Sequence, residues 1–508
     1  AWFDDPEYQA ISDHRRAGRI GISALAAVES PREQTIVQLQ AAATDEQAKI
    51  RETALIALAK SSLPQDVKAT QIEAALLDPA ASVRAAALVA IRRAGLFNES
   101  FAMACARRLP EADGEIANAI VKALGVIGTE ARPTFELLIE AVAAKSLEQS
   151  LVADTLAAFG EAVVPQLLET IEQRPELEPT LAIALAKVGE PAIPALLNGL
   201  ESHSKLIRLA ATRAIGELPT LTDELQRALL ARVKDEDASI RRVALSALLE
   251  RTADTPELRE LVVLSMADEN AEVRGEAYAS LSKLEFPQDQ LHALISGGLD
   301  DRDTLVISQS LGSLARLTAQ LAGQRSRVVA LVGHDASDIR QSAVQTLAKL
   351  GKDQVEDDVV QALASALEDS ERPVRLSATQ TIRDLGVKHE PLVQRVANNL
   401  VDDLELLRES LETIATFGPQ SDELVQSVSN LLQHEQSYIR SAAAKAVSAI
   451  DPQIDRKVGA LQSVLSDADW EVRRVAGIEL GKLGPPSKPA VPRLFELLSS
   501  DEDSDYAS

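Results

Sequence analysis

Apolar residues recur along most of this chain at the spacing of an amphipathic helix. Around Arg241, the positions one before and three and seven after the arginine hold Ile240, Ala244 and Leu248. Around most equivalent arginines these positions, and the one ten after, are apolar or small. Spacings of four, four and three residues place the side chains on one helical face, whereas a strand would alternate. The pattern therefore predicts helices throughout the chain.

The helical pattern belongs to a repeated phrase, Asp-x-x-x-x-(Val/Ile)-Arg-x-x-Ala, seen in DEQAKIRETA, DPAASVRAAA, DEDASIRRVA and DADWEVRRVA. Its marker arginine recurs as Arg51, Arg84, Arg208, Arg241, Arg274, Arg340, Arg375, Arg408, Arg440 and Arg473. Weaker copies carry other residues at positions 117, 149, 178 and 307. The mean step, roughly 32 residues, is typical of a repeat of two helices. A degenerate unit, RRAGRIGISALAAV, precedes the first marker.

Proline and glycine mark the ends of the expected helices. Proline suits a first helical turn, where its missing N–H costs no hydrogen bond, and it begins the first helix of several units. These prolines are Pro133, Pro194, Pro256, Pro391 and Pro492. Glycine can end a helix in the left-handed conformation and often closes the second helix. These glycines are Gly128, Gly160, Gly189, Gly351, Gly386, Gly418 and Gly484.

The phrase, with alanine three residues after the arginine and a terminal Leu-Gly, resembles the short bacterial HEAT-like repeat, including the type named after phycobilisome lyases. The resemblance covers roughly residues 15 to 500. It implies an all-α, right-handed α-α superhelix, a HEAT-like solenoid of about 15 helical hairpins in a single array over 1–508. The Thr-Pro-Leu-His phrase of ankyrin repeats and the Trp, Gly and Tyr pattern of tetratricopeptide repeats are absent.

The marker arginine needs a partner, because a cation in the first turn opposes the helix dipole. An aspartate six residues earlier recurs as Asp45, Asp78, Asp235, Asp268, Asp369, Asp402 and Asp467. Each can cap the turn that leads into the second helix and accept hydrogen bonds from an arginine of the same or the adjacent unit. We predict a structural ladder of these residues. A ligand site is the weaker interpretation, since such sites are rarely copied into ten units.

The repeat pattern weakens in two places. Residues 117–200 lack the marker arginine three times running and have five prolines crowded between residues 165 and 194, which predicts degenerate repeats with altered packing and curvature. A hinge, a surface specific to one partner and simple drift all remain open there. The fourth unit without arginine, at Ile307, is expected to bend the array without interrupting it. Residues 501–508, DEDSDYAS, fit either an acidic tail or a truncated next repeat.

Charge limits the class of partner. Lys and Arg total 52 against 77 Asp and Glu, a formal charge of -25 with a pI near 4.8. A polyanion would be repelled, so we expect no nucleic-acid partner and favour a protein partner that is basic or extended. No apolar run reaches the length of a membrane span. Oligomeric state stays open, and a chain beginning at Ala1 fits both a cytoplasmic protein and export after signal-peptide removal.

The sequence gives only weak indications of catalytic or metal-binding residues. Cys105 is the single cysteine and is expected to be a buried small hydrophobe. The pairs His389-Glu390 and His434-Glu435 evoke the iron ligands of the HEAT-like deoxyhypusine hydroxylases, but they stand at different phases of the repeat. His434, like His334, takes the place of the turn aspartate. No acidic cluster has calcium-loop spacing, so no cofactor, metal or catalytic residue is expected.

The function that these observations favour is a non-enzymatic scaffold or adaptor that binds a protein on the concave face of the solenoid. In arrays that these repeats resemble, the second helix of each unit lines that face. Tyr438 and Trp470 stand just before marker arginines and are candidate interface residues, although packing across a repeat edge explains them as well. The alternative, implied by the resemblance alone, is a chromophore lyase-like protein or maturation factor related to phycobilin lyases.

Overall fold

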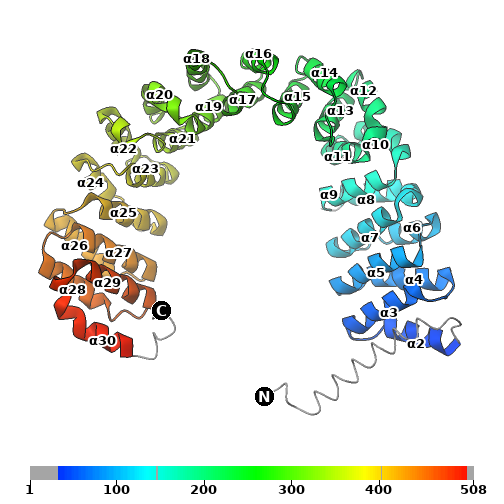
Figure 1. Ribbon diagram of the computed structural model, residues 1–508, viewed down its shortest axis with the longest axis horizontal. Helices are drawn as coiled ribbons and strands as arrows, with labels where there is room; N and C mark the ends of the chain where they lie inside the picture. Colours follow the sequence, from blue (N-terminus) through cyan, green and yellow to red (C-terminus); the bar gives the residue numbers. More distant parts are fainter. Residues whose placement is uncertain (1–32, 145–146, 402, 500–508) are drawn as a thin grey trace, which may run out of the picture. The chain divides into compact units, whose positions relative to one another are not determined.

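The computed structural model describes residues 33–144, 147–401 and 403–499, and within these ranges every regular element is helical. The chain forms two compact units, Ala1–Ala253 and Asp254–Ser508. Each unit is a stack of helical hairpins (Figure 1). The prediction of an all-α solenoid is confirmed, while the degenerate unit before Arg51 and the tail 501–508 lie outside the described residues.

The first unit contains seven described hairpins, each with a first and a second helix. They are α2 (Glu33–Ala43) with α3 (Ala48–Lys60), α4 (Gln65–Leu76) with α5 (Ala81–Ala94), α6 (Glu99–Ala106) with α7 (Gly114–Ile127), α8 (Phe135–Ala144) with α9 (Gln149–Ala158), α10 (Val164–Gln173) with α11 (Glu178–Val188), α12 (Ile193–Leu200) with α13 (Lys205–Glu217), and α14 (Asp223–Arg232) with α15 (Ala238–Arg251).

The second unit also contains seven described hairpins and one further helix. They are α16 (Pro256–Ser265) with α17 (Ala271–Ala279), α18 (Gln288–Leu299) with α19 (Thr304–Arg316), α20 (Thr318–Leu331) with α21 (Ser337–Leu347), α22 (Asp357–Ala366) with α23 (Arg372–Leu385), α24 (Glu390–Ala397) with α25 (Leu404–Phe417), α26 (Asp422–Asn430) with α27 (Ser437–Ile450), α28 (Ile454–Val464) with α29 (Trp470–Leu483), and then α30 (Val491–Ser499).

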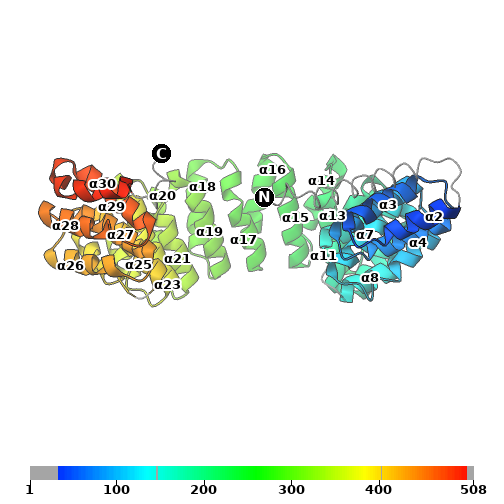
Figure 2. The ribbon, with the colours of Figure 1, turned by 90° about the horizontal axis from the view of Figure 1, so that it is seen from below.

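All fourteen marker positions fall at the start of a second helix, within its first five residues. The apolar stripe that follows each marker is buried: Ile240, Ala244 and Leu248 are each 0% exposed. In each unit, neighbouring second helices run side by side in one layer, as Figure 2 shows for α17, α19 and α21, and the first helices form the other layer. The core lies between the two layers, because each hairpin buries its stripes against its neighbours.

The three consecutive repeats without marker arginine share one kind of connection. Gly128, Gly160 and Gly189 have φ of 76°, 83° and 79°, a region that favours glycine, and each leads into a 3₁₀ turn before the next first helix. The connections after Gly160 and Gly189 are short, with 3₁₀ turns of three residues, which fits the shorter step between repeats there. Gly351 differs from the prediction: its φ is -70°, because it caps the 3₁₀ turn Lys352–Gln354 instead of ending a helix in the left-handed region.

The lengths and apolar composition of the helices give little indication of a membrane span. No single helix in the described ranges has the length and apolar composition to span a bilayer. Two bent pairs, Gln149–Ala158 with Glu161–Gln173 and Pro175–Val188 with Glu190–Leu200, meet those criteria only when their helices are taken together.

One close helix approach in the second unit can be tested. A Cβ at Gly298 would lie 2.7 Å from the ring of Tyr278 and would also meet the hydroxyl of Ser310. We expect Gly298→Ala to destabilise the unit by about 1–3 kcal/mol, because the packed side chains must shift. The matched change Gly312→Ala, where a Cβ meets nothing within 4 Å, should be neutral or stabilising by up to about 1 kcal/mol. Thermal unfolding with hydrogen exchange of α17–α19 measures both, and equal effects would contradict the expectation.

Candidate functional site

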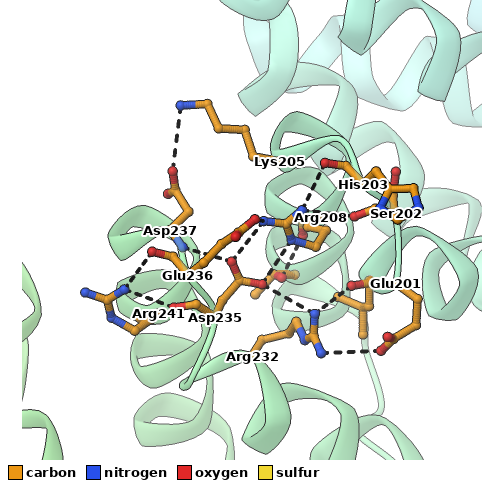
Figure 3. A network of polar contacts seen from close by, with 12 residues as sticks. Glu201, Ser202, His203, Lys205, Arg208, Arg232, Asp235, Glu236, Asp237 and Arg241 are labelled. Carbon is orange, nitrogen blue, oxygen red and sulfur yellow. Dashed lines mark hydrogen bonds and ion pairs between the residues drawn. The ribbon is translucent and has the colours of Figure 1, made fainter.

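The predicted arginines and aspartates meet at the edge where one hairpin follows another. Arg208 donates from Nε to Oδ2 of Asp235 at 3.0 Å and from Nη2 to Oδ1 at 3.1 Å (Figure 3). Its Nη1 donates to the backbone carbonyls of Ser202 and His203, in the turn before its own helix. The guanidinium therefore joins the turn of its own repeat to the aspartate of the next repeat.

Asp235 contacts the marker arginines of two repeats in different ways, and its Oδ2 also accepts from Nη1 of Arg232 at 3.3 Å. Its carboxylate accepts from Arg208, while its backbone carbonyl accepts from Nη1 of Arg241 at 2.9 Å, in the repeat to which Asp235 itself belongs. Its Oδ1 also accepts from the backbone N–H of Asp237 at 3.0 Å, which closes the turn ahead of the second helix. Asp237 caps the helix itself. The aspartate thus shapes the turn and links the repeats.

Four other marker arginines form the same bidentate pair as Arg208. The pairs, with their Nε to Oδ2 distances, are Arg51–Asp78 at 2.7 Å, Arg208–Asp235 at 3.0 Å, Arg274–Asp301 at 2.9 Å, Arg340–Asp369 at 2.6 Å and Arg440–Asp467 at 2.7 Å. In each pair, Nη1 of the arginine also donates to the carbonyls five and six residues before it. We call this series the arginine ladder.

Burial and charge act together on the ladder. The side chains of Arg208 and Asp235 are 7% and 2% exposed. Burial acts to raise the pKa of Asp235, but the hydrogen bonds from Arg208 and from the Asp237 amide outweigh it, and the pKa is lowered from 3.8. At Asp301 the hydrogen bond from Arg274 is the largest influence and again lowers the pKa. The aspartates are therefore ionised at neutral pH.

Three further predicted ladder members share the contact to the turn before their own helix. Arg241, Arg375 and Arg473 donate to the carbonyls of Asp235, Asp369 and Asp467 at 2.9, 2.7 and 2.8 Å. Asp402, the aspartate ahead of Arg408, lies outside the described residues.

The first and second hairpins show two further arrangements. The carboxylate of Asp45 accepts from the amide of Gln47, and Nη1 of Arg51 donates to the carbonyl of Asp45 at 2.8 Å. Arg84 donates to the carbonyl of Asp78 and pairs with Glu115, which lies in the first turn of α7 in the next repeat.

Asp268 completes the predicted set. Its carboxylate accepts from the amide of Asn270 at 2.9 Å, and its backbone carbonyl accepts from Nη1 of Arg274 at 3.0 Å. It therefore closes the turn ahead of α17 in the same way that Asp235 closes the turn ahead of α15.

Arg408 departs from the predicted ladder, and the reason lies one repeat further on. Its guanidinium donates to Glu409 at 2.8 Å and Glu412 at 3.4 Å on its own helix. The position that should supply its aspartate is His434, and an imidazole offers no pair of oxygens to a guanidinium. The Nδ1 of His434 accepts from the amide of Gln436 at 3.1 Å. The histidine thus replaces the aspartate in the turn, as the sequence indicated, but not in the ladder.

A second histidine shows the same relation. Nδ1 of His334 accepts from the amide of Ala336 at 3.0 Å. The preceding marker position holds Ile307, which is 4% exposed. This apolar side chain needs no carboxylate as a partner. Asp301 is the converse case, because its own repeat lacks a marker arginine. A search for aspartates six residues before an arginine therefore does not find it. Counting 27 residues forward from Arg274 finds it.

The candidate interface aromatics stand at the same end of the second helices. Tyr438 and Trp470 are each 44% exposed, in the first turns of α27 and α29. Their role at an interface stays a prediction. Cys105 is buried as expected, and burial raises the pKa of its thiol to about 12, so the thiolate form is suppressed.

The second-helix layers carry open grooves that the sequence did not indicate. One lies across α5, α7 and α9, has a volume of about 440 Å³ and is lined by Leu88, Val89 and Leu151 with Arg92 and Lys122. Another lies across α19, α21 and α23 and measures about 580 Å³. Within the described ranges no three His, Cys, Asp or Glu side chains gather as a metal site would require.

The ladder predicts unequal effects for two neighbouring aspartates. Asp301→Ala removes the partner of buried Arg274, and we expect a loss of about 3–5 kcal/mol in the stability of the second unit. Asp300 pairs with Arg327, and these two side chains are 60% and 43% exposed, so Asp300→Ala should cost no more than about 1 kcal/mol. Thermal unfolding of the two variants checks this, and equal shifts would show that the ladder does not hold the repeats.

The lowered pKa of Asp301 also predicts a dependence on pH. A folded-state pKa below the ordinary 3.8 means that the stabilisation is complete above that value and is lost as pH falls through the lowered pKa. The difference in Tm between the parent protein and Asp301→Asn should be constant from neutral pH to about pH 5 and shrink below pH 4. Melting curves across this range measure it. A difference that grows on acidification would contradict the assignment.

Comparisons with known proteins concern the fold. The model of the HEAT repeat associated with sister chromatid cohesion matches residues 69–90 and 216–248. No curated protein sequence matches the chain significantly. Among solved structures, the chain is similar to YibA of Escherichia coli, at 16% identity over 56% of this chain and 98% of that chain, with a TM-score of 0.40.

Two further solved structures cover most of the chain. Kap95p, which binds RanGDP, is 15% identical over 93% of this chain and 71% of its own, with a TM-score of 0.46. Importin beta is 13% identical over 98% and 75%, also with a TM-score of 0.46. The matched segments include the hairpins of Arg84 and Arg241, where the arginine contacts the turn before its helix. Residues 69–90 and 216–248 are therefore similar to HEAT repeats, and the fold in which they stand is an all-α helical solenoid.

Proposed function

We propose that the protein is a non-enzymatic scaffold that binds a protein partner on the second-helix layer. One observation carries this proposal. The recurring arginines pair with residues of the neighbouring repeat, whereas the second-helix layer has grooves that are open to solvent. The N–H donors of the Arg208 guanidinium are bonded to Asp235 and to two backbone carbonyls, which leaves few of these donors for a ligand. The grooves, in contrast, present side chains from three successive repeats to solvent.

The groove across α5, α7 and α9 has the chemistry of a contact for an apolar anchor. Val89 is 43% exposed beside Leu88 and Leu151, and Arg92 and Lys122 add polar groups. Protein interfaces often combine an apolar centre with a polar rim. A side chain that fills such a pocket commonly contributes more to binding than its neighbours do.

Charge supports a basic or extended partner. The formal charge of -25 gives the surface a negative potential that attracts a cationic protein and accelerates its association. Screening by salt weakens this attraction, because the Debye length falls as ionic strength rises. The partner should therefore be released by salt more readily than an apolar contact alone would be.

Two matched valines test the proposal. Val89 lies on the second helix α5, and Val37, 60% exposed, lies on the first helix α2. We expect Val89→Arg to reduce retention of native partners about tenfold or more, because it fills the groove and adds a positive charge, while Val37→Arg retains them. Affinity capture from native lysate at low and raised salt, with mass spectrometry, measures this.

Other outcomes would contradict the proposal. Equal retention by both variants would place the partner elsewhere, and retention that does not change with salt would remove the electrostatic part. A stoichiometric pigment in the absorption spectrum of the purified protein, with no protein partner, would replace the scaffold with the chromophore lyase-like alternative.

A further inference from the structure

The groove across α19, α21 and α23 differs from the apolar groove of the first unit in its lining. Neutral polar side chains from all three helices face it, together with Gly312. These side chains are Ser308, Gln309, Ser342, Gln345, Ser377 and Gln380. Its ionisable lining residues are Lys349 and Asp384, which stand near the carboxyl ends of α21 and α23. The groove therefore presents neutral polar side chains among the apolar Leu311, Ala315 and Ala348, with little charge.

Gln345 and Gln380 lie five residues after their marker positions, and Gln309 lies two residues after Ile307, about one helical turn earlier. Gln309, Gln345 and Gln380 are 36 and 35 residues apart and lie on three consecutive second helices. Adjacent packed helices are about 8–10 Å apart, and an extended polypeptide rises about 3.3 Å per residue. Each step from one glutamine to the next therefore spans roughly three residues of an extended chain.

These amides also have unused hydrogen-bonding capacity. The side-chain amide of Gln345 donates to Ser377 at 3.3 Å. The side-chain amides of Gln309 and Gln380 make no hydrogen bond to another described residue. A glutamine amide both donates and accepts, which matches the N–H and C=O groups that every peptide unit carries. Gly312 leaves open space beside them, since a Cβ there would meet nothing within 4 Å.

We propose that this groove binds an extended, uncharged polypeptide segment by hydrogen bonds to its main chain. The inference rests on the proposed scaffold function and names the kind of segment that the second unit would take. A small ligand would not need matching amides on three helices, and a charged segment would find only Lys349 and Asp384, of opposite sign, at the edge. Main-chain recognition through repeated polar groups tolerates many side chains.

Selection from a random-peptide phage library on the full-length protein tests the proposal. The peptides should be poor in charged residues, and their synthetic forms should bind about tenfold or more weakly to Gly312→Leu, because leucine occupies the space that the peptide needs. Gly459→Leu on α28 is the matched control, since a Cβ at Gly459 also meets nothing within 4 Å. Circular dichroism checks that both variants fold.

Backbone N-methylation separates main-chain recognition from side-chain recognition. Methylating alternate peptide nitrogens removes the donors, so affinity should fall about tenfold or more if the glutamines bind the main chain. Raised salt should leave the affinity unchanged, unlike that of a basic partner. Val89→Arg should also leave peptide binding intact, so failure of the proposed function and failure of this inference give different results.

Three outcomes would overturn the inference. They are the absence of any selected binder, binders that are charged and released by salt, and binders that Gly312→Leu and N-methylation leave unaffected.

Discussion

The guanidinium groups of the arginine ladder, which are buried or partly buried and each held between two hairpins, set the relation between successive repeats. An arginine has N–H donors in a fixed planar fork, and burying them without acceptors would cost far more than packing returns. In the pair Arg208–Asp235, two carbonyls of the arginine's own turn fill one side of the fork and the next repeat's carboxylate fills the other. Because both sides are satisfied only at one offset, the pair fixes how one hairpin follows the next.

The ladder explains why the arginine of one repeat and the aspartate of the next are present or absent together along the chain. Arginine and the aspartate one repeat later form a unit, so where Ile307 replaces the arginine, His334 can replace the aspartate. Arg408 shows what happens when only one member is lost: it turns to Glu409 on its own helix. A buried ion pair is a weak source of stability by comparison with apolar packing, but a broken one is costly, which favours its role in register.

Repeats inside and outside the ladder are also joined by other contacts. Hydroxyl side chains on some second helices donate to backbone carbonyls of the preceding second helix. These bonds are Thr155 to Val121, Ser313 to Tyr278, Thr381 to Val344 and Thr413 to Thr379. In residues 128–192, glycines with positive φ and 3₁₀ turns shape the connections. With the repeats held in these ways, the exposed second-helix layer is free to differ from repeat to repeat, as its apolar and neutral polar grooves do.

Local rules were enough to predict the helices, many of their boundaries and several ladder residues, although they missed Asp301. Helical spacing of apolar positions and the turn preferences of proline, glycine and aspartate act over a few residues, so Ile240, Ala244 and Leu248 could be assigned to a core without coordinates. The partner of each arginine could not, because Asp78 and Asp45 stand equally well placed along the sequence from Arg51. Only packing of hairpin on hairpin brings the carboxylate 27 residues ahead, and not the one six behind, within reach of the fork. The grooves likewise arise from the gaps between helices distant in sequence, which no local pattern records.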